Sequence, residues 1–72
     1  MTNEFFIATN VSSGMLIRLE RTRRGWRQVD LALIAGVTQT EVSALERRLY
    51  VIPAARHRIL EALDLDLEEG QP

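Results

Sequence analysis

Residues 28–48 read QVDLALIAGVTQTEVSALERR, and this stretch decides how the chain folds. Its first eight residues carry apolar side chains at helical spacing, which predicts an amphipathic helix over residues 28–35. The apolar face of this helix consists of Leu31, Ala32, Ile34 and Ala35. Because glycine adopts the left-handed backbone conformation without a steric penalty, Gly36 is expected to end the helix.

A second helix is predicted directly after this glycine. Thr38 is a favoured N-cap, and Glu41 three residues later completes a capping box, in which each side chain accepts a hydrogen bond from the other residue's backbone N–H. Val42, Leu45 and Leu49 recur at a spacing that places them on one inward face. The polar residues between them are expected to face the solvent.

The connection between these two helices is short enough to fix how they cross. Ala32 is small, so the second helix can approach the first closely, and Gly36 allows a tight turn. Val37, Val42 and Leu45 then fill the angle between the helices. This combination predicts a helix-turn-helix, a motif whose second helix lies in the major groove of DNA.

Two further helices are predicted, one on either side of this motif. The first begins at Ser12 or Ser13 and ends at Gly25, after two arginines whose charge complements the helix dipole. The last begins at Pro53, because proline suits the first turn of a helix. Their apolar residues are Met15, Leu16, Ile17 and Leu19 in the first and Ala54, Ile59, Leu60 and Leu63 in the last. We therefore predict an all-α fold, a small bundle of four to five helices.

The 72 residues divide into three parts within one domain. Residues 1–13 form an N-terminal arm, in which EFFIATNV is compatible with a strand, a partner-binding arm or a loosely packed lead-in. Residues 14–65 form the helix-turn-helix domain. Residues 66–72 form an acidic tail that is expected to be flexible.

The net charge of −1 conceals a separation of charge along the chain. All nine basic residues are arginines between Arg18 and Arg58, a span with four acidic residues, so this part carries +5. Five acidic residues and no basic residue follow from Glu61 onward. Because nucleic-acid binding depends on the local potential, the acidic total does not exclude DNA as a partner.

The composition argues against several other classes of protein. The absence of cysteine excludes disulfide scaffolds and thiolate metal sites, and the single histidine, His57, argues against a histidine metal site. No nucleophile–base pattern or glycine-rich phosphate loop is present, so we expect no enzymatic activity and no cofactor. No stretch approaches the ~20 apolar residues that cross a bilayer, and no signal peptide is apparent, which predicts a cytoplasmic protein.

QVDLALIAGVTQTEVSALERR, together with the preceding IRLERTRRGW, resembles the Cro/C1-type (XRE-like) helix-turn-helix domain. This domain occurs in phage repressors, restriction–modification controllers and antitoxins. The resemblance covers about half of the chain. It implies a lambda-repressor-like bundle whose partner is double-stranded DNA.

The resemblance also implies a recognition helix over residues 38–48 and a role for each matching residue. Gln28 matches a glutamine that binds a DNA phosphate and braces the recognition helix, and Gln39 is the best candidate to pair with adenine. Glu41 either accepts from a cytosine amine or serves only the cap. Arg21 and Glu46 match a pair that ties the first helix to the third. The residues expected to contact DNA are Arg27, Gln28, Thr38, Gln39, Thr40, Glu41, Ser43, Ala44, Arg47 and Arg48.

Three positions depart from the family pattern. Glu20 stands where the family usually has a leucine, which predicts a rotated or shifted first helix. Arg48 occupies the position of a glycine, and Pro53 arrives about one residue late. The recognition helix is therefore expected to run longer, toward Leu49 or Tyr50.

Several other residues allow two interpretations. The cluster RTRRGWR, residues 21–27, is either a phosphate-binding patch or a solvated surface. Residues 50–52, Tyr-Val-Ile, are either core or a dimer surface. Trp26 is expected in the core between the first two helices, and His57 on the surface. Ser43 and Ala44 are expected on an exposed turn, in reach of a phosphate or a thymine methyl group.

Taken together, the sequence predicts a sequence-specific DNA-binding transcriptional regulator, of repressor or controller type. We expect it to act as a homodimer on an inverted-repeat operator. The alternative, from a different class, is a protein-interaction module of the same fold, an antitoxin, anti-repressor or co-regulator whose main partner is a protein. The two hypotheses diverge at Gln39 and Arg47, which are expected to matter for DNA and not for a protein partner.

Overall fold

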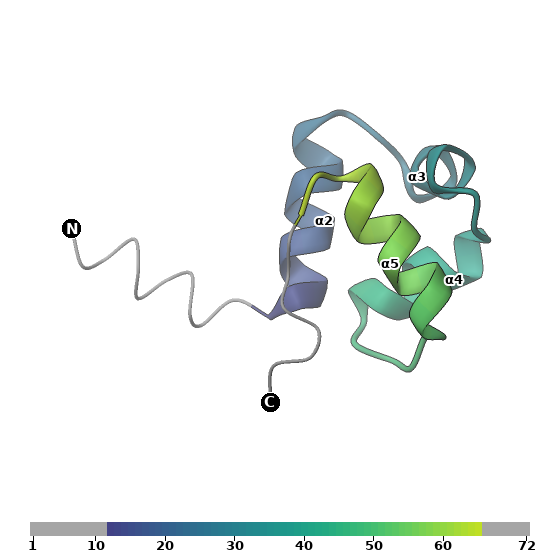
Figure 1. The fold of residues 1–72 in the computed structure, drawn as a ribbon. Coiled ribbons are helices and arrows are strands. Elements are labelled where there is room, and N and C mark those ends of the chain that lie inside the picture. The colour runs from purple at the N-terminus through teal and green to yellow at the C-terminus, as the bar shows by residue number, and fades with distance from the viewer. Residues whose placement is uncertain (1–11, 66–72) are drawn as a thin grey trace.

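A computed structural model describes residues 12–65, which form four helices and no strand (Figure 1). The helices are α2 (Ser13–Arg23), α3 (Gln28–Ala35), α4 (Gln39–Glu46) and α5 (Pro53–Ala62). The predicted all-α fold with a central helix-turn-helix, formed by α3 and α4, is confirmed. The predictions for residues 1–11 of the N-terminal arm and for the tail, residues 66–72, lie outside the described residues.

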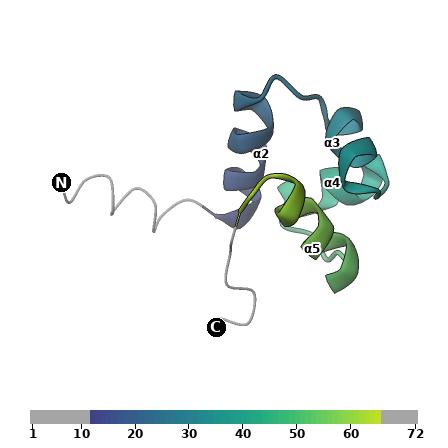
Figure 2. The same ribbon diagram turned by 45° about the horizontal axis from the view of Figure 1, so that its top comes forward.

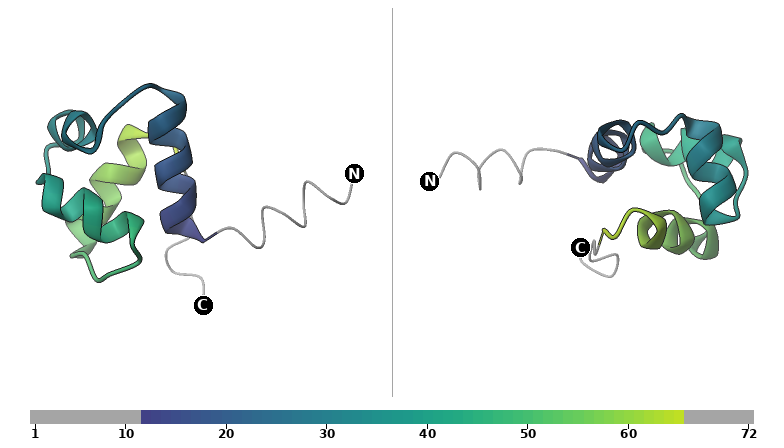
Figure 3. Two further views of the ribbon diagram at one scale, coloured as in Figure 1. Left: turned by 180° about the vertical axis from the view of Figure 1, so that it is seen from behind. Right: turned by 90° about the horizontal axis from the view of Figure 1, so that it is seen from above.

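The helices are arranged around α4, which packs against each of the other three. Figure 2 shows α3, α4 and α5 grouped together, with α2 standing beside them and joined to α3 by a turn across the top. From behind, α4 lies in front of α5 (Figure 3, left). The second helix of the helix-turn-helix is therefore held from three sides.

The buried core draws on all four helices. Ile17 from α2, Leu31 from α3, Val42 from α4 and Ile59 from α5 are completely buried. The other buried hydrophobic residues are Ala32, Leu45, Val51, Ala55, Leu60 and Leu63. Because a chain of this size buries only roughly 60% of its unfolded surface, few apolar residues are available to hold α4 in place.

The helices begin where the sequence predicts. The Ser12 hydroxyl accepts a hydrogen bond from the Met15 N–H at 3.1 Å, so Ser12 is the N-cap of α2. The predicted capping box of α4 is confirmed, with the Thr38 hydroxyl 3.0 Å from the Glu41 N–H and a Glu41 oxygen 2.9 Å from the Thr38 N–H. Pro53 opens α5 in its first turn.

All four helices end in the same motif. One residue takes the left-handed backbone conformation, and the N–H of the apolar residue after it bonds back to a carbonyl five residues earlier, which is the Schellman geometry. The left-handed residues are Gly25, Gly36, Arg48 and Asp64, with φ of 75, 76, 63 and 57°. The closing bonds run from Trp26 to Arg21 (3.0 Å), Val37 to Ala32 (3.0 Å), Leu49 to Ala44 (2.8 Å) and Leu65 to Leu60 (2.9 Å). The pattern repeats at every helix end, with glycine at only two of the four.

The predicted extension of the third helix is wrong. We expected the helix to continue toward Leu49 or Tyr50, but α4 ends at Glu46 because Arg48 adopts the left-handed conformation. The recognition segment, residues 38–48, thus comprises an N-cap, eight helical residues and the first part of a turn. Leu49 therefore leaves the helical stripe of Val42 and Leu45, and its side chain is half exposed.

Four other residues that we assigned to apolar helix faces are also exposed: Met15, Leu19, Ile34 and Ala54. In α5 the buried alanine is Ala55, the residue after the one we predicted. In α2, the face turned inward carries Ile17 together with Gly14 and the partly buried Arg21, and Met15 and Leu19 point away from it. The prediction failed there because a glycine and a paired arginine make up part of the inward face, and we had assigned neither residue to it. In α3, the neighbouring helices cover Leu31, Ala32 and Ala35, and Ile34 lies beyond them.

The residues whose position the sequence left open lie partly in the core and partly on the surface. Of residues 50–52, Val51 is buried, whereas Tyr50 and Ile52 are exposed, so the run is divided between core and surface. Trp26 is half-buried and packs against the core, and the Arg24 guanidinium lies 5.4 Å from the centre of its ring. His57 lies on the surface as predicted, 3.9 Å from Glu61.

Candidate nucleic-acid interface

α4 has one buried face and one polar face. Val42 and Leu45 point into the core, whereas Gln39, Thr40 and Arg47 are exposed and Ser43 is half-buried. The four polar residues line a shallow hollow in the surface together with Gln28, the first residue of α3. The fold therefore brings the start of α3 beside the outward face of α4.

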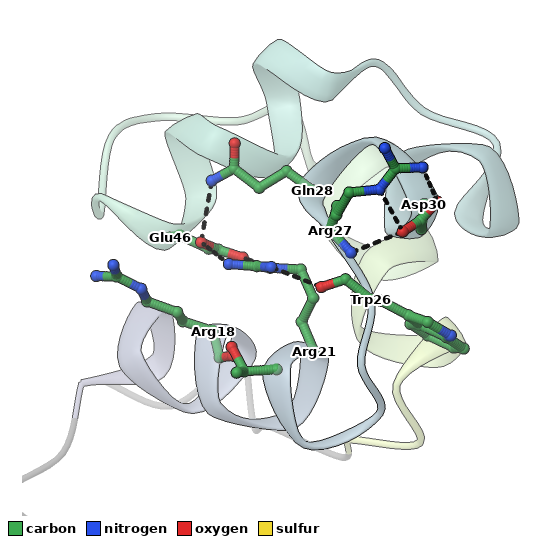
Figure 4. A network of polar contacts seen from close by, with 8 residues as sticks. Arg18, Arg21, Trp26, Arg27, Gln28, Asp30 and Glu46 are labelled. Atoms are coloured by element: carbon green, nitrogen blue, oxygen red, sulfur yellow. Dashed lines mark hydrogen bonds and ion pairs between the residues drawn. The ribbon is translucent and has the colours of Figure 1, made fainter.

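A polar network behind this hollow joins α2, α3 and α4 (Figure 4). The Arg21 guanidinium donates to the Glu46 carboxylate from Nε at 2.6 Å and from Nη2 at 3.2 Å, and to the Trp26 carbonyl from Nη1 at 2.7 Å. The Gln28 amide nitrogen donates to the same carboxylate at 3.1 Å. The pair that the family resemblance suggested is thus in direct contact, with side chains only 13% and 4% exposed.

This network fixes the Gln28 side chain at the edge of the hollow. One amide N–H of Gln28 is used by Glu46, and among the described residues no hydrogen bond uses the other N–H or the amide oxygen. A glutamine amide has two donors and one acceptor, so Gln28 keeps groups that can bind a ligand at the surface. Arg21 and Glu46, in contrast, are occupied with each other and serve to position α4.

Gly14 allows α2 to approach the end of α4 very closely. A Cβ atom at this position would lie 2.6 Å from the Glu46 carbonyl oxygen and 2.8 Å from that of Leu45. Both are backbone atoms at the C-terminal end of α4, so they have little freedom to move away. The absence of a side chain at Gly14 therefore sets the distance between α2 and the recognition helix.

The arginines between residues 21 and 27 are neutralised by neighbouring acids. Arg23 binds Glu20 at 2.8 Å, and this hydrogen bond lowers the pKa of Glu20. Arg27 binds Asp30 at 3.0 Å, which lowers the pKa of Asp30 and raises that of Arg27. Arg24 lies 3.8 Å from both Glu20 and Asp64, and Arg21 is held by Glu46. This segment therefore has the character of a solvated, internally paired surface and not that of an open phosphate patch.

Four arginines have no acidic partner among residues 12–65: Arg18, Arg47, Arg48 and Arg58. Arg47 lines the hollow, and Arg48 follows it. Arg18 extends from α2 on the same side as Arg21 (Figure 4). We did not single out Arg18 from the sequence, although a signal was available, because no acidic residue lies three or four positions away on its helix.

The remaining predicted contact residues differ in their surroundings. Thr38 and Glu41 direct their side chains into the capping box, which gives both of them a local role. Ala44 is half-buried and packs against the core, contrary to the exposed position expected for it. Arg27 points to Asp30, whose carboxylate also accepts the Arg27 backbone N–H at 2.7 Å and so caps the start of α3. Glu20, the departure in the first helix, is half-buried beside Arg23.

In residues 12–65, no helix is both long enough and apolar enough to cross a membrane. The same part of the chain holds no cluster of three or more histidine, cysteine or acidic side chains that could bind a metal ion. These two findings concern the described residues alone. The surface that the fold does assemble is the polar hollow on α4.

Comparison with known proteins agrees with this geometry. No curated protein matches the chain significantly. A protein-family model described as helix-turn-helix matches residues 17–69, which is most of the chain and includes the whole of α3 and α4. This family consists of DNA-binding domains and is not a family of enzymes. The chain therefore belongs to the helix-turn-helix family, of the Cro/C1 or XRE-like type.

Proposed function

We propose that this chain is a sequence-specific transcriptional regulator, of repressor or controller type, that reads operator DNA with α4. One observation carries the proposal: the exposed face of α4 and the start of α3 place Gln28, Gln39, Thr40, Ser43 and Arg47 around one hollow. Among residues 12–65, no acidic side chain pairs with Arg47, so its charge is available to a phosphate. The opposite face of α4 is anchored in the core by Val42 and Leu45.

In the proposed complex, α4 enters the major groove and its residues divide into two groups. Gln39 reads a base edge, because its amide can pair bidentately with adenine, a contact worth about 1–3 kcal/mol of discrimination. Gln28, Arg47 and Arg18 bind phosphates, which orients the helix without reading sequence. Each neutralised phosphate releases counterions, so affinity falls as salt rises.

Two copies of the chain on an inverted repeat complete the proposal. One short recognition helix reads only a few base pairs, and two helices on half-sites about 34 Å apart read enough to select an operator. Because the partner is DNA inside the cell, we place the protein in the cytoplasm.

The first test is fluorescence anisotropy with a labelled duplex from upstream of the gene for this chain, against an unrelated duplex of equal length, over a salt series. We expect preferential binding of the upstream duplex that persists at moderate salt. If the upstream DNA is not the operator, selection from random duplexes supplies one. Enrichment of no sequence would contradict the proposal.

Gln39→Ala tests the recognition residue itself. We expect it to weaken operator binding by about 1–3 kcal/mol and to relax the preference at one base pair, with little change in binding to unrelated DNA. Arg58→Ala, which removes an arginine on α5 instead, is the control. Unchanged operator affinity of Gln39→Ala would show that another residue reads the base.

The alternative, a protein-interaction module of the same fold, is favoured by a separate observation. Leu33 and Tyr50 are large hydrophobic residues that are 78% and 81% exposed, and neither lines the hollow on α4. A protein that bound over either residue would bury apolar surface that the domain leaves in contact with solvent. If a protein is the main partner, Gln39→Ala leaves its binding intact while Tyr50→Ser weakens it.

A further inference from the structure

Arg48 stands in a backbone conformation that disfavours its side chain. It has a φ of 63°, in the left-handed region, at the residue that ends α4. There its N–H bonds to the Leu45 carbonyl at 3.1 Å, and the following Leu49 N–H bonds to Ala44 at 2.8 Å. In this region a Cβ atom crowds the carbonyl oxygen, so glycine is the residue with no steric penalty.

The other three helix ends show that the strain at Arg48 is not required by the fold. Two of them use glycine, Gly25 and Gly36, and the third uses Asp64. Aspartate is among the few residues that visit this conformation readily, because its short polar side chain can bond locally. Arginine has no such advantage. Glycine at residue 48 would close the same motif without strain.

No contact of the Arg48 side chain within residues 12–65 offsets this strain. The side chain is exposed, and within residues 12–65 it forms no hydrogen bond or ion pair. The positive charge of Arg48 interacts favourably with the dipole of α4 at its C-terminus. Arg47 at the C-cap already supplies a cation there. A strained residue without internal compensation points to a function outside the fold.

We propose that Arg48 is a phosphate-binding residue and that the chain accepts a less stable end of α4 in order to keep its guanidinium at the DNA. This inference rests on the proposed function and deepens it. Arg48 directly follows Arg47, which lines the hollow with Gln39 and Gln28. The planar guanidinium presents a fork of donors that matches phosphate oxygens, which suits it to grip the backbone beside the helix that reads the bases.

Three substitutions at residue 48 separate strain from charge. Arg48→Gly removes both, so we expect a higher Tm and weaker DNA binding in the same protein. Arg48→Ala removes the charge but keeps a Cβ atom, so we expect DNA binding to fall as in the glycine variant without the gain in Tm. Arg48→Lys keeps the charge without the fork, so we expect a Tm near that of the wild type and an intermediate affinity.

The chain supplies its own controls. Asp64→Gly replaces a left-handed residue that carries less strain and removes a carboxylate 3.8 Å from Arg24, so we expect a smaller change in Tm than for Arg48→Gly and no weakening of DNA binding. Arg58→Ala removes an arginine of α5 that, like Arg48, has no acidic partner within residues 12–65, and it should change DNA binding much less than Arg48→Ala. Together these variants distinguish a local effect at residue 48 from a general effect of strain or net charge.

The readouts are Tm by thermal unfolding and the salt dependence of operator binding by anisotropy. Loss of one phosphate contact reduces the slope of log affinity against log salt by about 0.9, so the deficit of Arg48→Gly should shrink roughly three- to fourfold between about 50 and 200 mM salt. Arg48→Gly with wild-type affinity and slope, or with an unchanged Tm, overturns the inference. Failure of the wild-type chain to bind any duplex overturns the proposed function instead.

Discussion

Arg21 places its positively charged guanidinium in the interior of the domain. The position of α4 depends on the groups that bind this guanidinium. Glu46 accepts two hydrogen bonds from this guanidinium, the Trp26 carbonyl accepts a third, and Gln28 donates to the same carboxylate. These bonds offset the desolvation of both charges. Taking away one partner leaves the other buried without compensation, which costs about 3–5 kcal/mol in such pairs.

We therefore predict that Glu46→Ala lowers the free energy of unfolding by about 3–5 kcal/mol in urea denaturation. A domain of this size has a total stability of about 4–11 kcal/mol, so the variant should be close to unfolding. Glu20→Ala is the control, because it removes the carboxylate that pairs with Arg23, an arginine whose side chain is exposed on α2. If both variants lose the same small amount, the buried pair does not hold α4.

At this scale the sequence predicts most of what is local. The Thr38–Glu41 capping box and the ends at Gly25 and Gly36 were predicted because each signal lies within a few residues of the structure it forms. The left-handed Arg48 was not predicted, since arginine carries no preference for that conformation. The apolar residue that follows each left-handed position was the available clue, and at Leu49 we assigned it to a helical stripe instead.

Among the elements, α2 and α4 approach each other so closely at Gly14 that no side chain fits between them. Gly14→Ala should destabilise the domain by about 1–3 kcal/mol, the usual penalty for overpacking, because its methyl group meets two backbone carbonyls of α4. Since α4 has to shift to make room, operator affinity should fall beyond what the lost stability explains. Urea denaturation and anisotropy, both at a temperature where the variant is folded, measure the two effects.

Gly25→Ala is the informative comparison for this prediction. A methyl group at residue 25 would meet open space and is disfavoured only by the φ of 75°, so this variant should lose about 1–2 kcal/mol without moving α4. Its operator affinity, measured while folded, should match that of the wild type. Equal losses of affinity in both variants would mean that the α2–α4 spacing does not control recognition.

The core residues predicted for α2 were only partly right, whereas the bounds of α3 were predicted correctly. The bounds of α3, Gln28–Ala35, were predicted because both ends have local signals. Which face of α2 turns inward was not, because Gly14 and Arg21 occupy it for reasons that involve α4, far along the chain. Apolar periodicity cannot register a contact made by a missing side chain or by a paired charge.

For the whole molecule, the distribution of charge follows from which arginines remain unpaired. The sequence indicates a basic middle segment, but the fold neutralises much of it through Glu20, Asp30 and Glu46. Arg18 on α2, Arg47 and Arg48 at the end of α4, and Arg58 on α5 are left without acidic partners in the described part. The candidate site was therefore predicted on α4, where the motif is continuous in sequence. Arg18 on α2 was missed, because its local signal, the lack of an acidic residue three or four positions away, is much weaker than a motif.

The length of α4 determines how many chains are needed to bind one operator. One α4 of eight residues reads too few base pairs for a specific site, so we predict that two chains bind one inverted-repeat duplex. Linking two half-sites should tighten binding by about 10²–10⁴-fold over a single half-site. Anisotropy with full and half-site duplexes measures this gain, and sedimentation of the saturated complex gives the stoichiometry.

Changing the distance between the half-sites tests whether the two chains must lie on the same face of the duplex. An insertion of about five base pairs turns one half-site to the opposite face of the duplex, because B-DNA repeats every 10–10.5 base pairs. We expect the gain from the second half-site to disappear with that insertion, whereas each half-site on its own keeps its affinity. An unchanged affinity would mean that the two chains bind independently, so that recognition rests on each α4 alone.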